Sequence, residues 1–165
     1  MELIVKEKFR PSRDEILADV AALEKELATE LPAELKNFLI EAAATYPEPG
    51  GFDILDCPDA ENDECFGFFG GRGDGYLETL KCYRGRIPDD LLPIGYGSFG
   101  DAICYLLTGD EAGSVWYWNH ETESPETYAD RSNCYKCADS LQEFLDRLYE
   151  CDEEEEEDDE EEDDE

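Results

Sequence analysis

Charge is the feature that most constrains this chain, because it separates a part that can bury a core from a part that cannot. The last 14 residues, 152–165, are all acidic. Like charges repel one another and nothing apolar is available there to bury, so we expect these residues to form a disordered tail. The chain has a formal net charge of −33, and removing the tail leaves −19 on residues 1–151. We therefore expect one acidic globular domain over residues 1–151.

The same charge limits the partners that the domain can have. A strongly negative field repels nucleic acid and anionic membranes and attracts basic proteins. No charged segment followed by a long apolar stretch opens the chain, and no run approaches the roughly 18 apolar residues of a membrane span. The seven cysteines are an odd number, which suits reduced thiols better than a disulfide framework. We expect a cytoplasmic protein that contacts neither nucleic acid nor a membrane.

Two helix-start signatures bracket the globular part. Ser12 and Glu15 form a capping box, in which the side chain of each residue accepts a hydrogen bond from the backbone N–H of the other. Ser140 and Glu143 repeat this pattern near the end of the domain. Apolar residues recur at helical spacing after both boxes, and a further helix begins near Pro32. We expect three well-formed helices, over residues 13–29, 32–44 and 140–150.

The clearest strands lie in the middle of the chain. Residues 102–107 and 114–119 are rich in apolar and aromatic side chains, and the TGDEAG sequence between them is typical of a hairpin turn. Apolar residues occupy both faces of the first segment, which indicates a central strand. We therefore predict an antiparallel hairpin at the centre of the sheet. Short strands are also expected at residues 52–55 and 65–71.

Three other segments are less regular. Residues 76–83 fit a helix or a strand, with the helix favoured. Residues 84–95 contain two prolines and two glycines, and we expect a loop with a short buried segment there. The acidic stretch before the last helix is expected to be a polar loop.

His120 is the first residue to consider for catalysis, together with Asp101 and Glu121. A single histidine can act as a general base, but no recognisable motif ties a serine or cysteine nucleophile to this one. We interpret His120 as a polar residue at the end of a strand. The sequence therefore predicts no catalytic residues.

Cys134 and Cys137 have the spacing of a metal-binding knuckle. A structural zinc site needs two more ligands, and Cys57 and Cys65, separated by seven residues, do not form a second knuckle. A redox role would need a helix directly after the pair. Metal and redox roles stay open as alternatives, but we expect ordinary thiols, no metal ligands and no cofactor.

Several segments together resemble one family. These are LPAELKNFL, RIPDDLLPIGYGSFGDAICYLL, GSVWYWNHE and SLQEFL, in that order. The combination is similar to the SUKH superfamily, named for Smi- and Knr-type yeast proteins and their bacterial relatives. The resemblance covers about residues 10–150. Two features depart from the family pattern. Gly50 and Gly51 come later in the sequence than usual, after a proline-rich insert, and the acidic tail lies outside the usual domain.

The resemblance implies a single α+β domain with a twisted, mainly antiparallel sheet packed by helices. Many bacterial members look like immunity proteins, which bind and silence a toxin domain that is often a nuclease. Nucleases need basic sites to hold phosphates, so an acidic inhibitor is complementary to them. We expect a non-enzymatic immunity protein that neutralises a basic cognate toxin through an acidic surface. The alternative is an acidic regulatory scaffold or chaperone for basic proteins, and the oligomeric state stays open.

Specific binding requires a folded patch with shape, whereas the tail can add long-range attraction or only solubility. Fourteen extended residues reach roughly 45 Å at about 3.3 Å per residue. We place the specific patch near the hairpin and the turn before it. Its expected partner-binding residues are Tyr96, Asp101, Asp110, Glu111, Trp118, Asn119 and Glu121.

Overall fold

The computed structural model describes residues 2–5, 10–54, 63–69, 75–97 and 100–150. The expected acidic tail lies outside these residues. The helices are α1 (Arg13–Leu27), α2 (Ala33–Ala42), α3 (Gly75–Tyr83), α4 (Pro125–Asp130) and α5 (Leu141–Asp146), with a 3₁₀ turn at His120–Thr122. The strands are β1 (Glu2–Val5), β2 (Thr45–Glu48), β3 (Gly51–Asp53), β4 (Asp63–Phe69), β5 (Leu91–Gly97), β6 (Ala102–Leu106), β7 (Val115–Trp118) and β8 (Cys134–Ala138).

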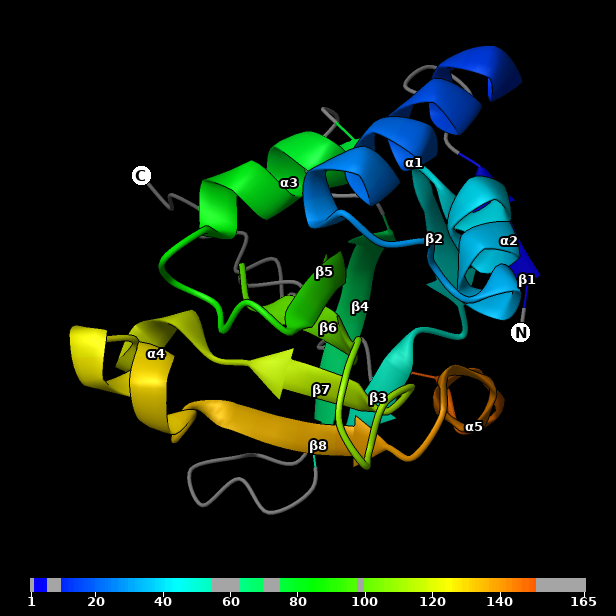
Figure 1. The fold of residues 1–165 in the computed structure, drawn as a ribbon. Helices are drawn as coiled ribbons and strands as arrows, with labels where there is room; N and C mark the ends of the chain where they lie inside the picture. Colours follow the sequence, from blue (N-terminus) through cyan, green and yellow to red (C-terminus); the bar gives the residue numbers. More distant parts are fainter. Residues whose placement is uncertain (1, 6–9, 55–62, 70–74, 98–99, 151–165) are drawn as a thin grey trace, which may run out of the picture.

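The main sheet has six strands in the order β3-β4-β5-β6-β7-β8, and every neighbouring pair is antiparallel. β1 and β2 form a separate antiparallel pair. In Figure 1, α1 and α3 lie side by side across the top of the view, and α4 lies at the left end of β7 and β8. The predicted class, an α+β fold with a mainly antiparallel sheet packed by helices, is confirmed.

The predicted hairpin is present. β6 pairs with β7 from Ala102 opposite Trp118 to Tyr105 opposite Val115. β6 has a neighbour on each side and its residues on both faces are mostly buried, as expected of a central strand. The helix favoured at residues 76–83 is confirmed as α3.

Two segments that were expected to be loops are strands. β5 runs through the LLPIGYG sequence and pairs with both β4 and β6. The prediction of a loop was wrong because Pro93 and Gly95 normally mark strand ends, but here they lie at a bulge in the β5–β6 register, where a proline is tolerated. The polar stretch before α5 likewise contains α4 and the edge strand β8.

The helices differ from the expected bounds mainly at their C-terminal ends. The Ser12 capping box is complete, with both hydrogen bonds at 3.2 Å. At α5 only half a box forms, because Glu143 accepts from the N–H of Asp139 instead. α5 ends at Asp146, well before the expected residue 150, since Tyr149 exchanges backbone hydrogen bonds of 2.7 and 3.0 Å with Gly51.

α1 and α3 are parallel neighbours with their C-terminal ends together. Near their N-terminal halves, Asp19 accepts hydrogen bonds from the backbone N–H groups of Tyr76, at 2.7 Å, and Leu77, at 3.3 Å. At the other end, Glu26 of α1 pairs with Arg84, which directly follows α3, at 2.5 Å. These contacts fix the register of the two helices.

The sheet carries a different apolar cluster on each face. Along β6, Ile103 and Tyr105 contact one cluster, and Ala102, Cys104 and Leu106 belong to the other. This alternation follows from the two-residue period of a strand. The first cluster includes the buried sides of α1, α2, α3 and α5 and is the main core.

The second cluster is smaller, and irregular chain packs against it. Ile87 belongs to it and Tyr83 packs against it, so the segment that leaves α3 covers part of this face. Trp118 of β7 is its largest side chain and is fully buried. The polar groups described next hold this covering in place.

Candidate partner-binding surface

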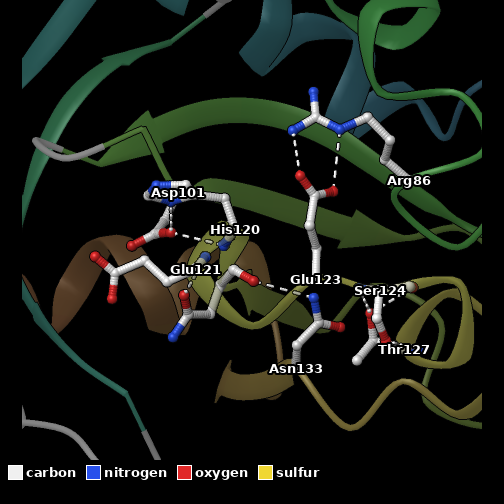
Figure 2. A network of polar contacts seen from close by, with 9 residues as sticks. Arg86, Asp101, His120, Glu121, Glu123, Ser124, Thr127 and Asn133 are labelled. Atoms are coloured by element: carbon white, nitrogen blue, oxygen red, sulfur yellow. Dashed lines mark hydrogen bonds and ion pairs between the residues drawn. The ribbon is translucent and has the colours of Figure 1, made fainter.

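A buried aspartate organises the end of the β6–β7 hairpin. Asp101 is 5% exposed and lies directly before β6. One of its carboxylate oxygens accepts from the hydroxyl of Tyr117. The other accepts from the backbone N–H of His120, at 2.9 Å, and lies 2.5 Å from the Nδ1 atom of His120 (Figure 2). Both oxygens are therefore used to fix the chain where it leaves β7.

The turn after β7 is held from two further directions. The side-chain oxygen of Asn119 accepts from the N–H of Glu121 at 2.9 Å and starts the 3₁₀ turn. Asn133, which is 1% exposed, donates its side-chain amide to the carbonyl of Asn119 at 3.0 Å and accepts the Asn119 N–H through its own carbonyl at 3.0 Å. The turn is thereby tied to the start of β8.

Arg86 links this turn to the segment that leaves α3. Its guanidinium donates to both carboxylate oxygens of Glu123, at 2.8 and 3.0 Å (Figure 2). The hydrogen bonds from Arg86 lower the pKa of Glu123, and those to Glu123 raise the pKa of Arg86. The same guanidinium lies over the rings of Tyr83 and Trp118, at 5.2 and 5.4 Å from their centroids. We call the contact between Arg86 and Glu123 the clasp, and it shields Trp118 from solvent.

Five of the seven residues expected to bind a partner lie together at this end of the hairpin. Glu121 is exposed, and Tyr96 and Asn119 are half-buried. Trp118 is fully buried, with its ring beneath Arg86, so its side chain is covered in this fold. Asp101 is also buried, and its carboxylate fixes the position of His120.

The other two expected residues lie at the opposite end of the hairpin. Asp110 and Glu111 are exposed in the loop between β6 and β7, about 15 Å from Asp101 along a five-residue strand. Glu111 pairs with Lys136 at 2.7 Å, and Lys136 also reaches Asp139 at 2.5 Å. The expected patch is therefore two separate surfaces.

Sequence reasoning missed further acidic residues beside Glu121. Glu126 and Asp130 are exposed in the same segment, residues 119–131, and the Glu123 side chain is partly exposed there, with its carboxylate paired to Arg86. The signal was available, since the HETESPETYAD sequence contains four acids in eleven residues. We call residues 119–131 the acidic turn.

The described residues give no support for a reaction centre here. No serine, threonine or cysteine in the described ranges is hydrogen bonded to His120. Across those same ranges no group of three or more histidine, cysteine, aspartate or glutamate residues could hold a metal ion. The polar groups instead hold a turn in a fixed shape.

Cys134 and Cys137 are strand residues, not loop residues. They lie three positions apart on β8, and they contact opposite clusters, so their thiols point to opposite faces of the sheet. Burial raises the pKa of Cys134 to about 11 and that of Cys137 to about 12, which disfavours the thiolate that a metal or a disulfide exchange requires. In this fold the two sulfurs cannot ligate one ion or bond to each other.

The class of protein follows from these features: an α+β domain with a helix-covered antiparallel sheet and an ordered acidic turn at one end. Among the helices that the structure describes, none is both long and apolar enough to cross a membrane. The model of the SMI1/KNR4 family (SUKH-1) matches residues 17–147, which is most of the chain. The chain belongs to this family, and the suspected SUKH resemblance is confirmed. Neither the comparison with curated proteins nor that with solved structures gave a match.

Proposed function

We propose that this protein is an immunity protein that binds and neutralises a basic toxin domain through its acidic turn. The observation that carries the proposal is the acidic turn itself, a dense group of exposed carboxylates on a prefolded segment. Opposite charges speed the encounter between this acidic surface and a basic protein. A protein that brings negative charges against the acidic turn is repelled at short range. Family membership supports the proposal, because the SUKH resemblance implies immunity proteins in bacteria.

The rigidity of the acidic turn favours specific binding. Hydrogen bonds accepted by Asp101 and Asn119 and donated by Asn133 fix its backbone before any partner arrives. A preorganised loop loses little conformational entropy on association, so more of the contact free energy appears as affinity. A run of 14 like charges carries little sequence information, which is why we assign residues 152–165 attraction and not specificity.

A binding role also suits the chemistry at His120. The Asp101 carboxylate already accepts from Tyr117 and His120, and the described residues place no nucleophile beside the imidazole. We therefore propose that the protein is not an enzyme and works without a cofactor. We also place its action in the cytoplasm, on a protein partner, without direct contact to nucleic acid or membrane.

The test is co-expression of this protein with the product of the adjacent reading frame, followed by pull-down and a growth-rescue assay. Rescue together with a stable complex supports the proposal. Binding to many unrelated basic proteins without rescue would instead support an acidic scaffold or chaperone. A reaction catalysed by the pure protein and abolished by His120→Ala would overturn the binding role.

Two sets of variants locate the surface. The double change Glu121→Lys and Glu126→Lys places two positive charges on the acidic turn and should weaken toxin binding by about 100-fold. The matched control is the double change Glu41→Lys and Glu48→Lys. It reverses two exposed charges that lie away from the acidic turn, on α2 and β2. The control should change binding by less than about fivefold; equal losses from both pairs would show that only net charge matters.

A further inference from the structure

A cavity of about 370 Å³ opens where α1 and α3 end, and it lies outside the acidic turn. Leu27 of α1, Leu80 of α3, and Ile87 and Leu91 of the following segment form its apolar walls. This volume is at the lower end of the range for ligand sites, about 300–1,000 Å³. The cavity is large enough for one long side chain and a neighbouring residue of a partner.

The charges around the cavity favour a cation. Glu26 and Asp89 are two acidic residues among those that line it. Arg84 is the basic side chain among the described lining residues, and its guanidinium already contacts Glu26 at 2.5 Å. The lining therefore keeps an excess of negative charge at Asp89, and this carboxylate raises the pKa of the nearby Tyr128 hydroxyl.

The helix ends add to this negative potential. α1 ends at Leu27 and α3 ends at Tyr83, and both of these residues line the cavity. Unpaired carbonyl groups give the C-terminus of a helix a partial negative charge equivalent to about half an electron. Both ends lie at the same site. Backbone N–H groups already donate to the carbonyls of Glu24, Lys25 and Tyr83, so the helix ends add only a small preference for a positive group.

We infer that this cavity holds an arginine or lysine side chain of the protein partner, with the aliphatic stem against Leu27 and Leu80 and the cationic group beside Glu26 and Asp89. Long basic side chains combine an apolar stem with a charged head, which is the combination that this lining presents. The acidic residues 152–165 of the chain itself have the wrong sign to occupy it.

The cavity and the acidic turn are close enough for one partner to contact both. Arg86 follows the lining residue Arg84 by two positions, and its side chain reaches Glu123 of the acidic turn. A basic surface bound at the acidic turn can thus place one side chain in the cavity. The inference rests on the proposed function only for the identity of the partner.

The direct test uses the peptide acetyl-Leu-Arg-Leu-amide and its uncharged citrulline analogue, titrated into ¹⁵N-labelled full-length protein. The expected result is a set of chemical-shift changes concentrated at residues 26–27, 80–84 and 87–91. The citrulline peptide should bind at least about fivefold more weakly, because the lining favours a cation. Shift changes spread evenly over the acidic surface would overturn the inference.

Two matched pairs of variants sharpen this test. Glu26→Gln should weaken binding of the arginine peptide by about two- to fivefold. Glu41→Gln removes an ion pair with Arg13 elsewhere on the surface and should leave the peptide affinity unchanged. Leu27→Trp should fill the cavity and remove the localised shifts. Leu17→Trp, at an exposed leucine of the same helix, should leave them unchanged. Equal effects within either pair would contradict a specific site.

The result can be separated from that of the proposed function. If Leu27→Trp neutralises the toxin as well as the unmodified protein, the cavity is not part of the interface, although the immunity function stands. If no toxin is neutralised at all, the immunity proposal fails, and the peptide titration still decides whether the cavity binds a cationic side chain.

Discussion

The two faces of the main sheet are covered in different ways. One face packs against α1, α2, α3 and α5 through a large apolar core. The other carries a smaller cluster, covered in part by the segment that leaves α3 and fastened by the contact between Arg86 and Glu123. Burial stabilises the first face, and polar contacts hold the shape of the second.

The largest expected difference between the faces comes from truncating a core side chain on each. Leu39→Ala in the main core should lower the free energy of unfolding by about 4 kcal/mol, because surrounding helices cannot fill the cavity left behind. Ile87→Ala in the smaller cluster should cost about 2 kcal/mol, since irregular chain can relax. Urea denaturation measures both values, and a larger loss at Ile87 would reverse the comparison.

Removing the buried carboxylate should cost about as much as Ile87→Ala. Asp101→Ala deletes an acceptor shared by Tyr117 and His120 and should lower the free energy of unfolding by about 2 kcal/mol. Amide hydrogen exchange should show faster opening of residues 119–124, with little change in α1. Protection that is unchanged at the turn would show that Asp101 does not hold it.

The clasp over Trp118 should contribute a small, pH-dependent amount. A double-mutant cycle of Arg86→Ala and Glu123→Ala should give a coupling of about 0.5 kcal/mol, because both side chains are partly exposed. The folded-state pKa of Glu123 lies below its ordinary value of 4.5, so this stabilisation is present above that pH and is lost as pH falls through the folded pKa.

The more exposed pair Arg13 and Glu41 provides a control for that cycle, since its side chains are 69% and 64% exposed. Its coupling should be close to zero. A coupling at Arg13 and Glu41 as large as that of the clasp would mean that the clasp gains nothing from its position over Trp118.

Removing the acidic tail should not change the stability of the domain. A chain ending at Glu150 should unfold at the same urea concentration as the full chain. At low salt its association with the toxin should be slower, by about tenfold, with a nearly unchanged dissociation rate. The difference should fade as the Debye length falls to about 8 Å near physiological ionic strength. Loss of binding at every salt concentration would make the tail itself the interface, and no change at low salt would exclude a steering role.

Local signals predicted the parts of the fold that depend on neighbours in sequence. The capping box at Ser12 and the hairpin over residues 102–119 are stabilised by contacts within a few residues, so their patterns are legible in the sequence. Strand β5 could not be predicted in this way, because Pro93 and Gly95 are acceptable in a strand only where the register with β6 contains a bulge. β8 was hidden among polar residues and depends on pairing with β7.

For the candidate surface too, the sequence predicted only the features that depend on neighbours in sequence. The sequence located Glu121 and Asn119 at the end of the hairpin, but it could not show that Trp118 lies beneath Arg86, a residue far earlier in the chain. It also grouped Asp110 and Glu111 with them, because a turn and the strand end after it are near in sequence although they lie at opposite ends of a strand.

By itself, the sequence determined the acidic character of this protein, its α+β class and its membership of the SMI1/KNR4 family (SUKH-1), because composition and short-range patterns carry that information. Only the tertiary structure decided which carboxylates stand together, which aromatic ring is covered, and that the ends of α1 and α3 enclose a cavity. Those features arise from contacts between residues distant in sequence, such as Glu26 with Arg84 and Arg86 with Glu123. Such contacts exist only once the whole chain has packed.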